Sequence, residues 1–417
     1  MNKLIYFEFI KAYKRKSFLC AVALMLAAMI LIPCTTIREN HWVTEDGVSV
    51  TGFAAIRAQK KAQNETAGDL TSEKIAAAIK SYQTAYGNPE NFESDGVGGS
   101  YLGNAAFGKY IQPYENINNL LRNAFSAKGE TYDFYVMDKL SSSDADAFYD
   151  RRMNKVEEYL NMDYSYGNYS ESDKEYYITK NEKIDTPFRI GYCEGWEKLL
   201  SISTISMMVI VLVICISLAP AFSSEYQTGA DAILLSAKYG KNKLIIAKIV
   251  SSFMLTSGIY WGGMLLLTIV TLLIYGAGGG SCSLQTLNLL APSDMTLFGS
   301  FLYVLLAGYF MCLFMQGLTL MLSAMLSSPF PVIIITLVSY FVPSFISYSR
   351  SSRLFNNILN LFPVKMASAY TALAKYELYH VLFLKIPYST MMILVALVVA
   401  VVTLPLAYKS FRKHQVA

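Results

Sequence analysis

The first chemistry that the sequence suggests is phosphate binding, at the dipeptide Gly240-Lys241. A nucleotide-binding loop of the common type has Ser or Thr directly after this dipeptide and a second glycine upstream of it. Here Asn242 follows the dipeptide, and Leu235 takes the place of the second glycine. Because both requirements fail, we expect this chain to bind no ATP itself.

Histidine and cysteine offer no catalytic site either. His41, His380 and His414 are isolated from one another in the sequence, which argues against a histidine-based zinc site. Only Cys193 and Cys282 lie outside the long apolar runs, and the sequence leaves open whether they form a disulfide. No apolar run holds the paired Asp, Glu or His of an intramembrane hydrolase or proton relay. We therefore expect no catalysis, no metal and no cofactor in this chain.

Long apolar runs indicate the class of the protein. Of its 417 residues, 53% are hydrophobic and 16% are charged, and the mean hydropathy is +0.34. A helix of roughly 20 apolar residues crosses the hydrocarbon core of a bilayer. The runs of suitable length are 18–37, 199–219, 249–275, 297–326, 331–346 and 388–408, of which the fifth is the shortest. The sequence predicts an α-helical polytopic membrane protein with six transmembrane helices.

Lysine and arginine predict the orientation. They gather in segments 1–17, 220–248 and 409–417, whereas segment 38–198 is net acidic. Because short cytoplasmic loops are rich in Lys and Arg, we expect the three basic segments, and both termini, on the cytoplasmic side of a bacterial membrane. Segment 1–17 has the pattern of an amphipathic helix in the membrane interface, and the alternative that it is a basic flank that only sets the orientation stays open. Segments 276–296 and 347–387 would then be outer loops, on the side of the acidic segment.

The acidic segment 38–198 is long enough to form an extracytoplasmic domain with its own core. Apolar residues at helical spacing predict helices at 71–86 and 145–160, and glycine with polar residues predicts a loop at 91–108. We therefore expect a mixed, partly helical domain. Tyrosine is dense at 159–177. These rings could present a binding surface for a cationic peptide or a sugar, or they could form a half-buried core, and both interpretations stay open.

The segment between the second and third apolar runs has the pattern of a short capped helix. Thr228 followed by Asp231 fits a capping pattern at a helix start. Apolar residues then recur at helical spacing. Lys238 falls in the last turn and Gly240 just after it, as is typical of a helix end. The sequence predicts a helix at 228–237, apolar on one side and basic at its end, which would suit a groove in another protein.

A series of short motifs crosses the same segment: a glutamate, then Thr-Gly, Leu-Leu-Ser and Tyr-Gly-Lys-x-Lys before the third run. This series resembles the coupling helix in the membrane permease subunit of ABC transporters of the ABC-2 type. The matching positions are Glu225, Thr228, Gly229, Leu234, Leu235, Ser236, Gly240, Lys243 and Lys248. Lys241 stands where family members often have Arg, and it lacks the planar fork of that residue. A large domain after the first run matches only some branches of the family.

The resemblance implies partners. In that family the coupling helix docks on a separate subunit that holds ATP and Mg²⁺ and hydrolyses the ATP. We therefore expect two copies of an ABC ATPase, a second permease copy or paralogue, membrane lipids around the dimer, and no nucleic acid. The residues expected to serve this coupling are Glu225, Thr228, Gly229, Asp231, Leu234, Leu235, Lys238, Gly240 and Lys243.

The resemblance also covers the loop 347–387. Two short segments there, 354–362 and 366–383, are similar to the re-entrant gate helices of the family. Phe362 and Pro363, at the break between them, are candidate residues of an outer gate. Glu377 is the only acid of the loop, and we expect it to form an interfacial salt bridge with a nearby basic residue.

Two features inside the apolar runs predict helix packing. Gly258 and Gly262 have the GxxxG spacing that lets helix backbones approach closely in lipid. Gln316 is the most polar residue well inside a run, and we expect it to hydrogen-bond a neighbouring helix rather than contact a substrate.

The resulting hypothesis is an ATP-driven exporter that moves an amphipathic substrate, an antimicrobial peptide or a lipid, across or out of the cytoplasmic membrane. An acidic outer domain is compatible with a cationic peptide, and an apolar pathway with a lipid. Two alternatives stay open. In mechanotransmission the ATPase stroke moves the outer domain and nothing crosses the membrane. In a non-transport sensor the acidic, Tyr-rich domain binds a ligand and the inner loop relays a signal.

Overall fold

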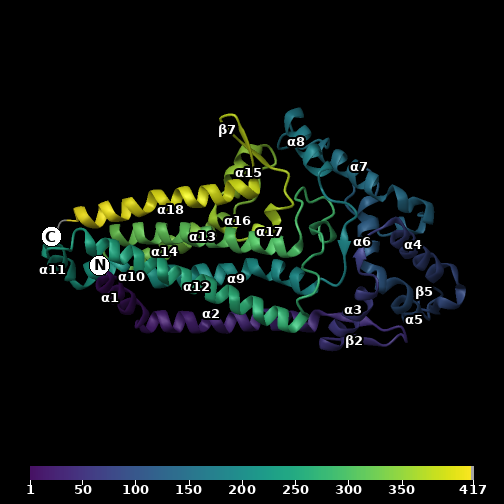
Figure 1. Cartoon of the computed structure of the whole chain (residues 1–417), viewed down its shortest axis with the longest axis horizontal. Coiled ribbons are helices and arrows are strands. Elements are labelled where there is room, and N and C mark those ends of the chain that lie inside the picture. Colours follow the sequence, from purple (N-terminus) through teal and green to yellow (C-terminus); the bar gives the residue numbers. More distant parts are fainter. Residues whose placement is uncertain (415–417) are drawn as a thin grey trace.

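Long helices form a bundle that occupies one half of the molecule (Figure 1). The computed structural model describes residues 1–414, so the last three residues of the predicted tail 409–417 lie outside the described part. Within residues 1–414, five helical segments are long and apolar enough to cross a membrane. They are α2 (Lys16–Thr35), α9 (Glu194–Leu218) continued by α10 (Pro220–Thr228), α12 (Lys243–Tyr275), α13 (Leu297–Met325) and α18 (Tyr388–Lys413).

The fifth predicted span is shorter than expected, and six spanning helices are not confirmed. The run 331–346 contains α14 (Pro329–Phe341), a helix of 13 residues followed by a single 3₁₀ turn at Val342–Ser344. At about 1.5 Å per residue, such a helix does not reach across roughly 30 Å of hydrocarbon. Pro343 lies in that turn and interrupts the regular helix, and the chain becomes polar after Phe345 and Ile346.

The second predicted span is longer than expected at both ends. It begins at Glu194 rather than residue 199, and Pro220 does not end it, because α9 and α10 together form one helical segment from Glu194 to Thr228. Proline is tolerated as the first residue of a helical segment, where its missing N–H is not needed. The hydroxyl of Ser323 in α13 lies 2.9 Å from the backbone nitrogen of Phe222 and accepts its hydrogen bond.

Close packing in the bundle uses glycines other than those predicted. A Cβ built on Gly258 or Gly262 would meet no atom within 4 Å, so the GxxxG pair makes no close helix contact inside this chain. A Cβ on Gly308 would lie 2.4 Å from Met207 Cε, and one on Gly317 would lie 2.1 Å from the Thr403 hydroxyl. These two glycines of α13 allow α9 and α18 to approach. Gln316 is buried, and its Oε1 has no hydrogen-bond partner among the described residues.

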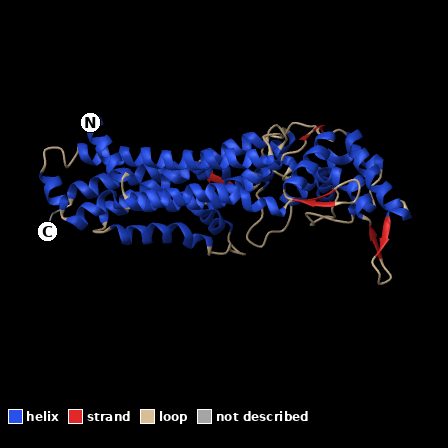
Figure 2. Cartoon of the chain, turned by 90° about the horizontal axis from the view of Figure 1, so that it is seen from below, coloured by secondary structure: helices blue, strands red, loops and turns tan. Residues whose placement is uncertain are grey.

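The distal domain, residues 38–193, lies at the opposite end from both termini (Figures 1 and 2). It is mostly helical, with three small antiparallel strand pairs, β1–β2, β3–β6 and β4–β5. Its elements are β1 (His41–Val43), β2 (Ser49–Thr51), α3 (Phe53–Glu65), β3 (Gly68–Asp69), α4 (Ser72–Gly87), β4 (Phe92–Ser94), β5 (Ser100–Leu102), α5 (Asn104–Ala106), α6 (Glu115–Ala124), α7 (Phe148–Leu160), α8 (Glu171–Glu182) and β6 (Arg189–Ile190).

The helices predicted at 71–86 and 145–160 correspond to α4 and α7, whose apolar positions form the domain core around Ile79 and Phe148. The loop predicted at 91–108 was wrong: this stretch contains the hairpin β4–β5 and the short helix α5. Gly96 and Gly98 have positive φ angles of 77° and 98°. They make the turn between two strands, so the glycines marked a hairpin rather than an irregular loop.

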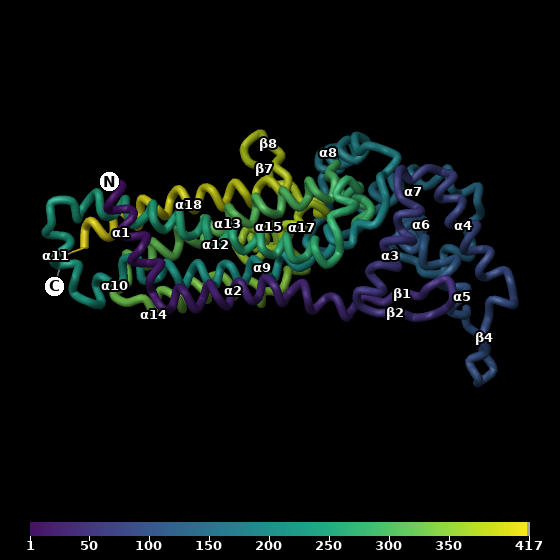
Figure 3. Tube along the Cα trace, turned by 60° about the horizontal axis from the view of Figure 1, so that its bottom comes forward, coloured from purple at the N-terminus to yellow at the C-terminus, as the bar shows by residue number. Residues whose placement is uncertain are grey.

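Two further segments complete the chain. At the end that carries both termini, α1 (Asn2–Tyr13) packs against α12, and α11 (Ala230–Ser236) projects beyond the bundle (Figure 3). Between α14 and α18, the loop 347–387 contains α15 (Arg353–Asn360), α16 (Pro363–Met366), α17 (Ala369–Ala372) and the hairpin of β7 (Leu378–Val381) with β8 (Leu384–Pro387). The second helix predicted there, at 366–383, was wrong, because alternating side chains after residue 377 pair as strands.

Candidate functional site

A cluster of four charged side chains, three of them buried and Lys11 partly exposed, joins three helices at the end of the bundle that carries the termini. The Nζ atom of Lys248, on α12, lies 2.7 Å from Glu225 Oε1 on α10 and 2.9 Å from Glu8 Oε2 on α1. Lys248 also donates to the carbonyl oxygen of Ala221 at 2.9 Å. Lys11 Nζ, one turn after Glu8 on α1, lies 2.6 Å from the same oxygen of Glu225. The four charges therefore balance one another.

The positions of these residues follow from helix geometry. Glu8 and Lys11 are three residues apart, so they share one face of α1 and meet α10 and α12 together. Burying a charged side chain costs roughly several kcal/mol, unless that side chain is paired with an opposite charge and hydrogen-bonded. Arg15 lies nearby; burial lowers the pKa of its guanidinium, and the carboxylates of Glu225 and Glu8 oppose that shift. Displacing one of the three helices would expose unpaired charges, which makes the helices move together.

The helix predicted at 228–237 is shorter and starts differently. Gly229 adopts the left-handed conformation, with φ 69°, and separates α10 from α11. The Thr228 hydroxyl donates to the carbonyl oxygens of Ser224 at 2.9 Å and Glu225 at 3.3 Å, so it belongs to the last turn of α10 and does not cap the next helix. α11 has seven residues rather than about ten, because the residue after Ser236 is already extended.

α11 has an inward and an outward side. Asp231 is buried, and its Oδ2 lies 3.3 Å from His414 Nε2 near the end of the chain. Leu235 is buried in the hydrophobic core of the bundle. Ile233, which the motif does not include, is 75% exposed on the outward side, and Leu234 is half-buried. The apolar residues at helical spacing, Ala230, Ile233, Leu234 and Ala237, are therefore exposed or half-buried, while Leu235 holds the helix on the bundle.

Gly240 is needed for a close approach rather than for ending a helix. A Cβ on this residue would lie 1.6 Å from the carbonyl oxygen of Leu234, because the chain folds back over α11. Lys243 begins α12 and places its Nζ 4.3 Å from the ring centroid of Tyr239; the Nζ of Lys238 lies 5.7 Å from the same centroid. Both lysines are exposed.

Apart from the half-buried Leu234, the predicted coupling residues thus form two groups. Four are buried and hold the segment on the bundle: Glu225, Asp231, Leu235 and Gly240. Four are exposed and available to another molecule: Thr228, Gly229, Lys238 and Lys243. Sequence reasoning missed Glu8, Lys11 and His414, whose partners lie more than 180 residues away in the chain.

A family model described as ABC-2 family transporter protein matches residues 4–416. The chain belongs to this family. Its members are the membrane components of ABC transporters, and an ABC ATPase subunit is their partner. No curated protein and no solved structure gives a match. The buried charge cluster and α11 therefore belong to the permease of an ABC transporter.

The candidate outer-gate residues of this ABC-2 permease lie in the loop 347–387. Phe362 and Pro363 stand at the start of α16. Glu377 precedes β7, and its Oε2 lies 3.7 Å from Arg353 Nη1. Burial raises the pKa of Glu377, and the charges of Arg353 and Lys375 oppose the shift. The neighbour His380 pairs instead with Asp173 of α8, at 3.1 Å.

The tyrosines of segment 159–177 pack against this loop. Tyr169 and Tyr177 are buried in one cluster with Tyr376. The guanidinium carbon of Arg353 lies 3.9 Å from the ring centroid of Tyr169 and 5.3 Å from that of Tyr166. Of the two interpretations, the half-buried core describes Tyr169 and Tyr177. The sequence could not show it, because the partners of these rings lie about 200 residues further along the chain.

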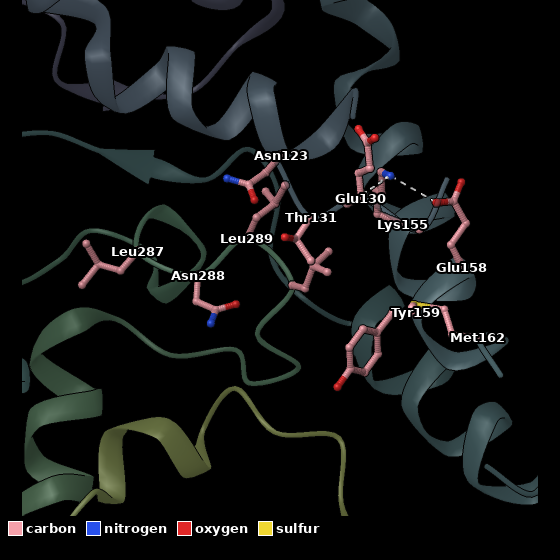
Figure 4. Close-up of a pocket in the computed structure, with 12 residues that line it drawn as sticks. Asn123, Glu130, Thr131, Lys155, Glu158, Tyr159, Met162, Leu287, Asn288 and Leu289 are labelled. Carbon is pink, nitrogen blue, oxygen red and sulfur yellow. Dashed lines mark hydrogen bonds and ion pairs between the residues drawn. The ribbon is translucent and has the colours of Figure 1, made fainter. Parts of the chain in front are cut away.

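The ABC-2 permease also has cavities between the distal domain and the bundle. One of about 300 Å³ lies between α6–α7 and residues 287–290 (Figure 4). The Nζ of Lys155 at its wall is already bonded to the carbonyl oxygen of Ala127 at 2.7 Å and to Glu158 Oε2 at 3.2 Å. Within the described residues, no three His, Cys, Asp or Glu side chains come together as metal ligands. Cys193 and Cys282 are both unbonded.

Proposed function

We propose that this permease belongs to an ATP-driven exporter and that an ABC ATPase docks on its segment 228–243. The observation that carries the proposal is the cluster of Glu8, Lys11, Glu225 and Lys248, which connects the two helices that flank that segment. ATP and Mg²⁺ bind in the ATPase. Two ATPase copies and a second permease copy or paralogue complete the exporter, with the termini and α11 on the cytoplasmic side.

The connections of α11 support a mechanical role. It follows α10 through Gly229, and α10 continues α9 as one helical segment. A short turn connects it to α12, and the side chain of Leu235 anchors it in the bundle core. In the bundle, α9 packs against α2, α12, α13 and α14. A push on α11 would therefore reach most of the bundle through α9 and α12, and could switch the dimer between inward-open and outward-open states.

Photo-crosslinking tests the docking site. A benzophenone amino acid in place of Ile233, which is 75% exposed, should crosslink to the co-expressed ATPase. The matched control replaces Val97, which is 89% exposed on the β4–β5 hairpin of the distal domain, and should give no such product. Crosslinking from residue 97 instead of 233 would place the ATPase at the other end of the molecule and refute the proposal.

Mechanotransmission is the second candidate, and one contact favours it. Arg353 stacks on Tyr169, so the distal domain is attached to the loop next to α18. Movement of the bundle would then move this domain. In proteoliposomes, an exporter transfers an amphipathic probe across the bilayer when ATP is added. A mechanotransmission protein changes the distance between labels on Val97 and the bundle without moving the probe.

The third hypothesis, a non-transport sensor, has less support, because the family consists of membrane components of ABC transporters. The tyrosine-rich segment 159–177, which would bind the ligand of such a sensor, also packs largely against the loop 347–387.

A further inference from the structure

A cavity of about 540 Å³ lies where the distal domain meets the loop 347–387. One wall is the tyrosine-rich segment, through Tyr159 and Tyr166. The other wall is formed by the start of the loop, by α15 and by residues 375–377. No residue of the proposed ATPase-docking segment contributes to it. The cavity lies at the other end of the bundle, beside the start of α18.

The walls of this cavity are aromatic. Tyr159, Tyr166, Tyr348 and Tyr376 line it, and the rings of Tyr159 and Tyr376 lie 5.1 Å apart. Such rings offer flat apolar surfaces together with hydroxyl groups, so they suit a ligand with both polar and apolar parts.

Two cations at the cavity have no acidic partner among the described residues. Lys375 is bonded only to neutral groups, with its Nζ 3.0 Å from Asn360 Oδ1 and 3.4 Å from the Tyr348 hydroxyl. Arg350 lines the cavity and forms no ion pair there. Burial lowers the pKa of Lys375, and the charge of Glu377 opposes that shift without forming an ion pair with it. A desolvated ammonium group with neutral neighbours is stabilised by an anion placed beside it.

The one acid of the cavity, Glu377, fills this need only in part, because its ion pair is with Arg353 and not with Lys375. The Oε2 atom of Glu377 lies 3.7 Å from Arg353 Nη1, so the negative charge of Glu377 is compensated by the positive charge of Arg353. The cavity in Figure 4 differs in this respect, since its lysine, Lys155, is paired with Glu158. The net charge of the groups around the larger cavity is therefore positive, although the distal domain as a whole is acidic.

Helix α15 connects this cavity to an apolar surface. Asn356 and Asn360, one turn apart, are buried on the side toward the cavity. Leu354 and Ile358, also one turn apart, are 71% and 53% exposed on another side of the same helix. A ligand with a charged head and an apolar tail requires a polar surface next to an apolar one. The two sides of α15 provide both.

We propose that this cavity binds the phosphate or carboxylate head group of an anionic amphiphile, whose apolar part lies over Leu354 and Ile358. Lys375 and Arg350 bind the head group, and the tyrosine rings surround the region next to it. Binding of the amphiphile does not depend on the proposed exporter function. Only the inference that the bound amphiphile is also transported rests on that function. The same charges exclude a cationic peptide from this cavity.

Binding can be measured without ATP, so its outcome is independent of ATPase coupling. The full chain is placed in phosphatidylcholine nanodiscs and titrated with fluorescent phosphatidylglycerol. Unlabelled phosphatidylglycerol should displace the probe, and phosphatidylcholine should not. The variant Lys375→Gln should weaken binding by about tenfold, the size expected for one charge-assisted contact. The control Lys139→Gln, an exposed lysine of the distal domain, should bind like the natural protein.

A second pair of variants separates the head from the tail. The variant Ile358→Asn should weaken phosphatidylglycerol binding but leave competition by glycerol phosphate unchanged. Arg350→Gln changes an exposed residue and repeats the charge test if Lys375→Gln does not fold. Equal affinity for phosphatidylcholine, equal loss in Lys139→Gln, or displacement by glycerol phosphate as effective as by the lipid would each overturn the proposal. Saturable binding of a cationic antimicrobial peptide that depends on these residues would overturn it too.

Discussion

The ammonium group of Lys248 lies 2.7 Å from the carboxylate of Glu225, and both side chains are almost fully buried, with 2% and 4% of their surface exposed. The residues come from α12 and α10, on either side of the segment that the motif series marks. This ion pair, with Glu8 and Lys11 around it, connects the N-terminal helix to both helices that flank α11. Glu225 is therefore buried among charged partners from α1 and α12.

Replacing Lys248 by Met should lower stability strongly. The change leaves Glu8 buried without its partner, and breaking a buried ion pair from one side costs about 3–5 kcal/mol. Thermal unfolding of the purified protein in detergent measures the loss. The control is Lys243→Met, an exposed lysine five residues earlier on the same helix, for which we expect a change within about 0.5 kcal/mol. Equal unfolding temperatures for the two variants would contradict the importance of the cluster.

The variant Gly229→Ala tests the connection between α10 and α11. Its φ angle of 69° costs an L-residue about 1–2 kcal/mol, whereas no atom within 4 Å would clash with the new methyl group. We expect normal amounts of protein in the membrane and a clear drop in ATP-driven transport. Gly258→Ala is the matched control, because its methyl group also meets no atom but its backbone is helical. Transport that falls equally in both variants would show that the backbone at Gly229 is not the cause.

Glu377 should make the stability depend on pH. Since burial raises its pKa in the folded state above the ordinary 4.5, its contribution is fully present below that value and is lost as pH rises through the folded pKa. The variant Glu377→Gln lacks this titration. The difference in unfolding temperature, natural protein minus variant, should therefore decrease between about pH 4 and neutral pH. For Glu175→Gln, an exposed glutamate of α8, the difference should stay constant.

His414 should restrain α11 through Asp231. Removing the imidazole in His414→Ala takes away the side chain that lies 3.3 Å from the buried carboxylate, and the partial exposure of His414 limits the cost to about 1 kcal/mol. We expect faster amide hydrogen exchange in residues 230–236 and unchanged exchange in the middle of α12. Lys413→Ala, an exposed neighbour, serves as the control. Unchanged exchange in α11 would mean that the contact does not hold the helix.

Much of the general design was predictable because it depends on local properties of the chain. Apolar runs define membrane helices by length alone, and five of the six predicted runs contain helices long enough to span. The motif series from Glu225 to Lys248 indicated the ABC-2 family, and the family model agrees over residues 4–416. The exception, α14, ends early where proline and polar residues follow it.

What only the tertiary structure decided is which distant side chains meet. Glu225 and Thr228 looked equivalent in the motif, yet one is buried with Lys248 and the other is exposed, because burial depends on which faces of α1, α10 and α12 are in contact. The sequence by itself determined the class of the protein and its family, and it marked the segment that we propose as the coupling segment. The pairing of Arg353 with Tyr169, and the cavity beside it, required the fold, because no local pattern relates residues about 180 positions apart.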